Sequence, residues 1–450
     1  MTDILALLQC LEPYVSSTTM RQMSHIITAM LSMTGRVTML NISRWTDKGG
    51  SYRTVQRWYY TVIPWALAFW LFFRQYLFNP QNTYLLVGDG VTVTKAGQDT
   101  HGVGRFFSSL YGKPVPGLAF FALSLVSVQE RRSYPVMVEQ VIRTEEEKAA
   151  AKTKKAATKA KKKGPKRKPG RPKGSKNKDK TQVKLTSELE LIKTMLQKLL
   201  MLINGFMSLT YLVLDGQFGN NNALQMTLQC GLQLISKLRH DAALYFPYDG
   251  PYSGSGPYRQ YGDKIDYNHI PEKHLKEDFV EDDMRTCIYQ MTMLHKEFAQ
   301  RLNIVIIVKT NLKTHSRAHV VLFSSYSDLA YALLIDYYAL RFQIEFNFRD
   351  AKQFWGLEDF MNIKYTPVTN SANLSLFMVN VSYLLLRHFR QLKPQAGVLD
   401  LKAHFHGCKY VSETLKLLPD FPDPILLNQV FDAVSQLGSI HPVVPCSSPP

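Results

Sequence analysis

The sequence predicts an α/β fold with parallel strand pairs, and three observations support this. From residue 83 onward, apolar strand-like runs alternate with helical segments. Two of these runs, "TYLLVGDG" and "LTYLVLDG", reach an acid, Asp89 and Asp215, near their ends, and "VTVTK" continues the first. Hydrophobic residues make up 45% of the chain and aromatic residues 12%, enough to build a core.

Changes in sequence texture predict several regions within the 450 residues, a length that suits two or three domains. In chain order these are a helical N-terminal domain (1–80), the first part of the α/β core (81–145), a basic linker (146–182), a second core part (183–239), a mostly β insertion (240–328), a third core part (329–390) and a helical C-terminal region (391–450).

The N-terminal region is predicted to contain a helix pair. A polar break at 47–50 is followed by Ser51, a residue suited to cap the helix that begins "YRTVQRWYY". Such a pair fits a DNA-binding helix-turn-helix, with Arg53 and Arg57 facing the duplex, or an ordinary helical subdomain. The most apolar run, 59–73, has 15 residues and precedes Arg74. It is shorter than the roughly 18–20 residues a membrane span needs, so we expect a buried helix and no membrane association.

Positive charge is concentrated in one stretch. Residues 148–180 hold sixteen Lys and Arg against one acid, so they carry +15 of the formal +18 and leave +3 elsewhere. Within this stretch, Gly-Arg-Pro around Arg171, flanked by Lys168 and Lys173, resembles an AT-hook, which lies in an A·T minor groove. The other interpretation is a basic linker that holds any polyanion loosely. The five cysteines are scattered and form no CxxC, which fits a reducing cytosol and argues against a zinc site.

A helix of roughly 25 residues is predicted to begin near Asp328. On it, one polar stripe about 60° wide contains Tyr338, Arg341, Glu345 and Lys352. An apolar seam lies beside it, formed by Leu333, Tyr337, Leu340, Ile344, Phe348, Ala351 and Trp355. By spacing alone, the stripe is equally a solvated face with ordinary ion pairs.

The two strand-associated acids favour a functional interpretation of the stripe. Open α/β sheets place their sites at the carboxyl ends of strands, so Asp89, Asp215 and Glu345 could converge there. Three carboxylates in one place need a counter-charge. Two Mg²⁺ ions about 3.5–4 Å apart would supply it and would promote in-line attack on a phosphodiester. Asp336 and Asp350 lie more than about 100° off the Glu345 stripe, which favours Glu345 as the third ligand.

The spacing of Tyr338, Arg341, Glu345 and Lys352 resembles the Tyr-Arg-Glu-Lys signature of one group of bacterial insertion-sequence transposases of the DDE class. The resemblance implies a ribonuclease-H-like catalytic core interrupted by a β insertion between the second and third acids. It also implies a cytoplasmic, nucleoid-associated enzyme that cuts transposon ends and joins them to target DNA, as a homodimer in the synaptic complex.

For the site, the resemblance implies that Asp89, Asp215 and Glu345 are catalytic and hold two Mg²⁺ ions, for which Mn²⁺ can substitute. Tyr338 and the two cations of the stripe, Arg341 and Lys352, would bind phosphates of double-stranded DNA. Better-known members stack a flipped base on a Trp of the β insertion, and residues 240–328 contain no Trp; Tyr289, Phe298 or Tyr326 are the substitutes considered. The competing functions are a non-catalytic DNA-binding protein and a stand-alone nuclease.

Deleting residues 148–180 is expected to weaken DNA binding and to flatten its salt dependence while leaving the metal site intact. If the stretch contacts six to ten phosphates, affinity should fall by roughly 10³–10⁵ between 50 and 200 mM salt in the intact chain. Binding titrations of both proteins at several salt concentrations would measure this. An unchanged salt slope would contradict the expectation.

Overall fold

The computed structural model describes residues 3–46, 50–108, 111–143, 179–252, 254–420 and 422–441. Its helical elements are α1 (Ile4–Leu8), η1 (Gln9–Leu11), α2 (Ser17–Ser32), α3 (Met39–Trp45), α4 (Tyr52–Tyr60), α5 (Trp65–Phe72), the π-helix η2 (Phe73–Leu77), α7 (Ser187–Ile203), η3 (Gly216–Phe218), α8 (Asn221–Gln229), η4 (Glu272–His274), α9 (Tyr331–Leu340), α10 (Gln343–Phe354), α11 (Tyr365–Phe389), α12 (Val398–Leu415) and α13 (Pro424–Ser435). Its strands are β1 (Tyr84–Thr94), β2 (Gly104–Ser108), β3 (Lys113–Ser127), β4 (Arg132–Val141), β5 (Tyr211–Val213), β6 (Gln233–Leu238), β7 (Leu244–Pro247), β8 (Tyr261–Lys264), β9 (Leu275–Glu281), β10 (Met284–His295), β11 (Leu302–Asn311) and β12 (Arg317–Ser324).

The strands form one sheet of mixed direction, in the order β2-β3-β1-β5-β6-β12-β11-β10-β7-β8, with β4 on β3 and β9 on β10. Among the described strands, two pairs are parallel, β1 with β5 and β5 with β6. The expected parallel pairs are therefore found at the centre of the sheet, and the other strand pairs are antiparallel. Parallel neighbours need long crossovers, whereas β1 to β4 and β9 to β12 are joined by connections short enough for antiparallel pairing.

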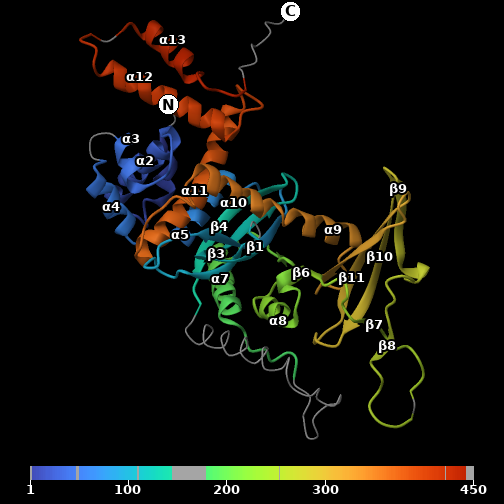
Figure 1. The fold of residues 1–450 in the computed structure, drawn as a ribbon. Coiled ribbons are helices and arrows are strands. Elements are labelled where there is room, and N and C mark those ends of the chain that lie inside the picture. Colours follow the sequence, from blue (N-terminus) through green and yellow to red (C-terminus); the bar gives the residue numbers. More distant parts are fainter. Residues whose placement is uncertain are drawn as a thin grey trace, which may run out of the picture.

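Helices pack on the part of the sheet that β1 to β6 form. In Figure 1, the long helix α11 crosses the body beside β4, the helices α2 to α5 gather on one side, and α12 with α13 project from the same body. The strands β9 to β11 extend away on the other side as an arm, with α9 running between arm and body. Nearly the whole middle of α11 is buried, because it packs on β4, α4, α10 and α12 at once.

Several helices begin where the sequence places a capping side chain. Ser51 accepts a hydrogen bond from the Thr54 amide at the start of α4, as predicted. Ser16, Thr186 and Asn220 cap α2, α7 and α8 in the same way. These oxygens satisfy amides that have no partner within a helix, so the sequence itself fixes where these helices begin.

The apolar run 59–73 is divided between two helices. It contains the end of α4, a turn at Pro64, and α5, whose Trp65, Phe69 and Phe72 are buried. The predicted burial is confirmed, although the run is not one helix. Among the described residues, no helix is both long and apolar enough to span a membrane.

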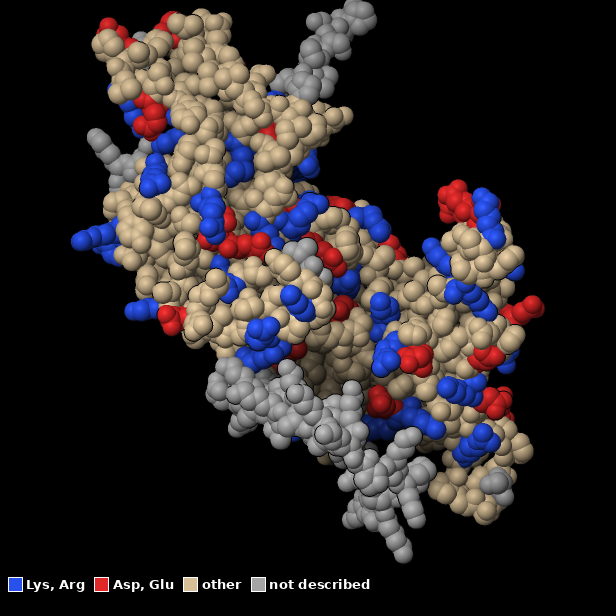
Figure 2. All heavy atoms as spheres, in the orientation of Figure 1, with Lys and Arg blue, Asp and Glu red and all other residues tan. Residues whose placement is uncertain are grey.

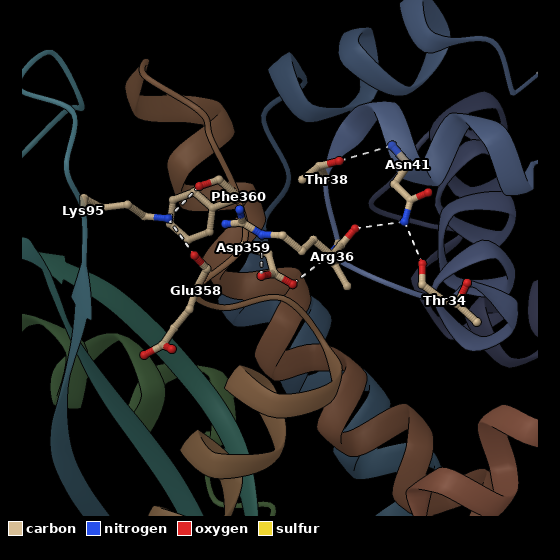
Figure 3. A network of polar contacts seen from close by, with 9 residues as sticks. Thr34, Arg36, Thr38, Asn41, Lys95, Glu358, Asp359 and Phe360 are labelled. Carbon is tan, nitrogen blue, oxygen red and sulfur yellow. Dashed lines mark hydrogen bonds and ion pairs between the residues drawn. The ribbon is translucent and has the colours of Figure 1, made fainter. Parts of the chain in front are cut away.

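The N-terminal helices are bound to the rest of the chain by a polar contact after α10. Asp359 accepts hydrogen bonds from the amide of Val37 at 2.9 Å and from Nε of Arg36 at 3.2 Å, as Figure 3 shows for the ion pair. Residues more than three hundred positions apart are thereby held together.

Asp359→Ala is expected to lower the free energy of unfolding by about 1–2 kcal/mol, because the Val37 amide loses its acceptor and Arg36 its counter-charge. Urea unfolding followed by circular dichroism would measure it. The matched control is Asp336→Ala, which removes a more exposed carboxylate that pairs with Arg131 and should cost about 0–1 kcal/mol. Equal losses in the two variants would contradict the assignment.

Candidate active site

Parallel pairing brings Asp89 and Asp215 to the same level of the sheet. Val87 of β1 lies opposite Val213 of β5. Continuing that register by two residues places Asp89 opposite Asp215, although β5 itself ends at Val213. Residues at one level of neighbouring parallel strands direct their side chains to the same face. The two carboxylates therefore face the same space.

The two acids are held by different local structures. Asp215 caps the turn η3, where its side chain accepts from the Gln217 amide at 2.9 Å. Its carbonyl accepts from the hydroxyl of Ser236 on β6 at 2.7 Å. Asp89 lies inside the long strand β1, so the expectation that it stands near a strand end is wrong for the chain. The strand end at this site is that of the short neighbour β5, which ends two residues before Asp215.

Asp89 is largely buried, with a side-chain exposure of 19%. The pKa of Asp89 is raised to about 6, mainly by burial; Arg341 and the Gly90 amide oppose the rise, and the charges of Asp215 and Glu345 add to it. That Asp215 and Glu345 both act on Asp89 shows that the three carboxylates share one neighbourhood.

A guanidinium lies between the strand and the helix. Nη1 of Arg341 is 2.6 Å from Oδ2 of Asp89, and Nη2 is 3.1 Å from Oε1 of Glu345. Arg341 is itself mostly buried, with a side-chain exposure of 15%. One cation therefore bridges the first and third acids of the predicted set.

The helix carrying these residues is not continuous. The predicted helix of roughly 25 residues is two helices, α9 and α10, joined at Arg341 and Phe342. Around this joint the amides of Arg341, Phe342, Ile344 and Glu345 bond three residues back rather than four. A turn of this 3₁₀ type brings residues three apart into line, so Arg341 lies over Tyr338.

Tyr338 belongs to the same site, whereas Lys352 lies at the far end of α10. Burial raises the pKa of Tyr338; the charges of Asp215 and Asp89 raise it further, and Arg341 acts in the opposite direction. Nζ of Lys352 donates to the carbonyl of Thr92 on β1 at 3.1 Å and pairs with Glu358.

Other predicted site residues lie apart from this cluster. Arg53 and Arg57 are exposed on α4, and their contact with DNA stays a prediction. Lys168, Arg171 and Lys173 fall outside the described residues.

Two details of the predicted helix faces are wrong. Leu333 is 44% exposed, and Leu334 takes its place in the seam. Asp350 is not part of the predicted apolar seam but is buried and pairs with Arg349.

Of the three aromatics considered for base stacking, Phe298 is buried, Tyr289 is half-buried, and Tyr326 is 40% exposed. Tyr326 follows β12 at the level where β5 and β6 begin, since the Ser325 amide bonds to the Leu234 carbonyl. That level is about 10–13 Å along the strands from Asp215. None of the three is therefore an exposed ring beside the carboxylates.

The aromatic surface that sequence reasoning missed is on α10 itself. Phe342 and Phe346 are 49% and 37% exposed and meet edge to face with centroids 5.4 Å apart. Arg349 lies over the Phe346 ring at 4.8 Å. They flank Arg341 and Glu345 in the sequence, and their spacing of four residues was the available signal. They were passed over because aromatic residues in a helix usually belong to its buried seam.

The donor set suits a hard divalent cation, since it consists of carboxylate oxygens from Asp89, Asp215 and Glu345 with a single guanidinium as counter-charge. In the described parts of the chain, no three His, Cys, Asp or Glu side chains are gathered closely enough to enclose a metal ion. Arg341 holds two of the carboxylates directly. The three carboxylates therefore fit a divalent cation by their chemistry and their charge.

A family model described as DDE superfamily endonuclease matches residues 7–293, more than half of the chain. The chain belongs to this family. Membership in the DDE superfamily endonucleases makes DNA its substrate and a transposase-like nuclease reaction its activity; such enzymes typically use divalent metals. The matched region contains Asp89 and Asp215 and ends before Arg341 and Glu345. No curated protein matches the chain.

Asp89→Asn is expected to stabilise the metal-free endonuclease at pH 7. A pKa raised to about 6 means that the folded protein binds more protons than the unfolded chain between about pH 4 and 6. Stability from this group is therefore present below about pH 4 and lost as pH rises through 6, at a cost of up to about 3 kcal/mol. Urea unfolding of both proteins at pH 4 and 7 would test this. The expectation would be contradicted if the stability of Asp89→Asn relative to wild type were lower at pH 7 than at pH 4.

Proposed function

We propose that the chain is a DNA transposase that cleaves transposon ends and joins them to target DNA, by a cut-and-paste route. The observation that carries the proposal is the shared neighbourhood of Asp89, Asp215 and Glu345, of which Arg341 bridges the first and the third. A stabilising ion-pair network would not need a third acid nearby, because the two that bind the mostly buried guanidinium already exceed its charge.

The central topology supports a ribonuclease-H-like core. The strands β4, β3, β1, β5 and β6 lie in that order, with β1 antiparallel to β3 and parallel to β5. The first two acids lie at the middle of this set, on neighbouring parallel strands. The arm formed by β7 to β12 enters the chain between the second and third acids.

In this proposal Asp89, Asp215 and Glu345 provide the oxygen ligands for two Mg²⁺ ions. Bound Mg²⁺ supplies an activated water or 3′-hydroxyl and stabilises the leaving oxygen. Arg341 neutralises a phosphate close to the reacting bond, and the Tyr338 hydroxyl donates a hydrogen bond to the same backbone. The matching lysine of the Tyr-Arg-Glu-Lys group has the same role. To bind a phosphate here, Lys352 would have to give up its contacts with Thr92 and Glu358.

Further DNA contacts are proposed for surfaces away from the carboxylates. Phe342 and Phe346 offer exposed rings beside the site, where an unpaired base could stack for about 1–3 kcal/mol. Figure 2 shows Lys and Arg on both sides of the hollow between the helical body and the strand arm. The AT-hook-like stretch and the helix pair α3 and α4 would bind duplex DNA outside the reacting bond, in a nucleoid-associated homodimer.

Two other functions fit the family in part. A non-catalytic DNA-binding protein would bind DNA without cutting it, and a stand-alone nuclease would cut without joining. The intact set of three acids disfavours the first. The second is favoured by no particular observation, because nothing in the carboxylate cluster itself distinguishes cutting from joining.

Asp215→Ala is expected to reduce Mg²⁺-dependent cleavage by at least about 10³-fold, because one of three metal ligands is lost. The assay uses duplex DNA that carries the inverted repeats flanking the coding sequence, with an acceptor plasmid whose junctions are sequenced. Asp336→Ala removes an acid of α9 that pairs with Arg131 and should cut at the wild-type rate. Equal cleavage by wild type and Asp215→Ala would overturn the catalytic assignment, and cleavage without joined products would favour the nuclease.

A further inference from the structure

The segment that follows α10 is bound to the strand that carries Asp89. Lys95 comes directly after β1, and its Nζ donates to the carbonyls of Glu358 at 3.1 Å and Phe360 at 2.6 Å. The same ammonium lies 3.9 Å from the centre of the Phe360 ring. Figure 3 shows the lysine reaching from its strand to both carbonyls. A half-buried ammonium with three such partners is a specific attachment.

A second lysine makes the reciprocal contact. Nζ of Lys352, on α10, donates to the carbonyl of Thr92 on β1 and pairs with Glu358 at 2.8 Å. One lysine thus crosses from helix to strand, and the other crosses from strand to the segment after the helix. Both are hydrogen bonds to main-chain carbonyls, so they fix backbone positions rather than side-chain positions.

The other side of this segment is fixed as well. Asp359 holds the amide of Val37 and the guanidinium of Arg36. Gly356 has a φ of +76°, and a Cβ there would lie 2.3 Å from Cβ of Val37. The segment therefore packs closely against the N-terminal region, and these contacts hold it beside Lys95.

These contacts bear on the separation between strand and helix at the carboxylates. Glu345 lies seven residues before Lys352, about 10 Å along α10. In its middle, α10 packs on β4 and α11, and Asn347 donates to the Ser133 hydroxyl of β4 at 2.7 Å. Contacts at its far end restrict its remaining tilt and so restrict where Glu345 stands relative to Asp89. A misplacement of about 1 Å is enough to weaken a ligand set.

We propose that Lys95 is a positioning residue, which restricts where Glu345 stands relative to Asp89 by fixing the segment after α10 to β1. The inference rests on the proposed function, because it takes these two acids as metal ligands. It assigns to Lys95 no contact with DNA or metal.

Lys95→Met is the variant that tests this, since it keeps the length of the side chain and removes the ammonium. Mn²⁺ alone is titrated into the full chain without DNA, and free Mn²⁺ is followed by electron paramagnetic resonance. We expect a dissociation constant about tenfold higher than that of wild type, the range in which outer ligand supports act. Lys95→Arg, which keeps a cation and N–H donors, should recover most of the affinity. Cleavage by Lys95→Met should recover at high Mn²⁺, because the ligands themselves remain.

Lys402→Met is the matched control. Nζ of Lys402 also donates to a main-chain carbonyl, that of Met30 at 2.7 Å, and lies 5.0 Å from the Trp355 ring. Burial lowers the pKa of both lysines to about 8. Lys402 links α12 to α2 and reaches the C-cap residue of α10, Trp355, but does not join that end of the helix to β1. Its loss should therefore lower the melting temperature and leave Mn²⁺ affinity within about twofold.

The outcomes separate the inference from the function on which it rests. Wild-type affinity in Lys95→Met, or an equal loss in Lys402→Met, overturns the positioning role while leaving the metal site in place. Equal Mn²⁺ binding by wild type and Asp215→Ala overturns the metal site, and the inference with it. If Lys95→Met does not fold, Lys95→Gln, which keeps an N–H donor without the charge, replaces it; wild-type affinity and cleavage at low Mn²⁺ in that variant overturn the role.

Discussion

The ion pairs of Arg341 join the two halves of the site. One nitrogen of the guanidinium binds the strand that carries Asp89, and the other binds Glu345 on α10. Taking charges out of water is costly, and mutual attraction offsets that cost only when the geometry is good. Here two acids share one cation and a third adds its charge to theirs, so the cluster carries uncompensated negative charge. Burial is the main cause of the raised pKa of Asp89, and the negative charges of Asp215 and Glu345 add to it.

The backbone around the cluster explains how such an arrangement is maintained. Asp89 is fixed by a long strand with neighbours on both sides, whereas Asp215 depends on a three-residue strand, a capped turn and the Ser236 hydroxyl. Arg341 stands at the joint between α9 and α10, where the hydrogen bonds tighten. Each of the three positions is therefore set by main-chain contacts, which suits a site that must hold like charges close together.

The sequence predicted much of this and missed parts that depend on tertiary contacts. The proximity of Asp89 and Asp215 was predicted from the two apolar runs that each reach an acid. In the structure, the parallel register of β1 and β5 brings the two residues to the same level. The joint at Arg341 was not predictable, because no Gly or Pro marks it and both residues there keep right-handed helical angles. Leu333 and Leu334 are equally apolar, so periodicity could not choose between them.

The antiparallel extension of the sheet lacked any local signal in the same way. It depends on β6 pairing with β12, which the chain reaches only after more than seventy further residues. The roles of the site residues stay predictions, because geometry alone does not report chemistry.

That pairing of β6 with β12 has a mechanical consequence. Four consecutive residue pairs connect the arm to the strand next to β5, so the arm continues the central sheet instead of hanging from a flexible linker. Detaching it would break main-chain hydrogen bonds in the middle of the molecule. The arm is therefore joined through the sheet itself to the strand that carries Asp89. A DNA molecule that contacts both the arm and the carboxylates must therefore span the strands that lie between these two sites.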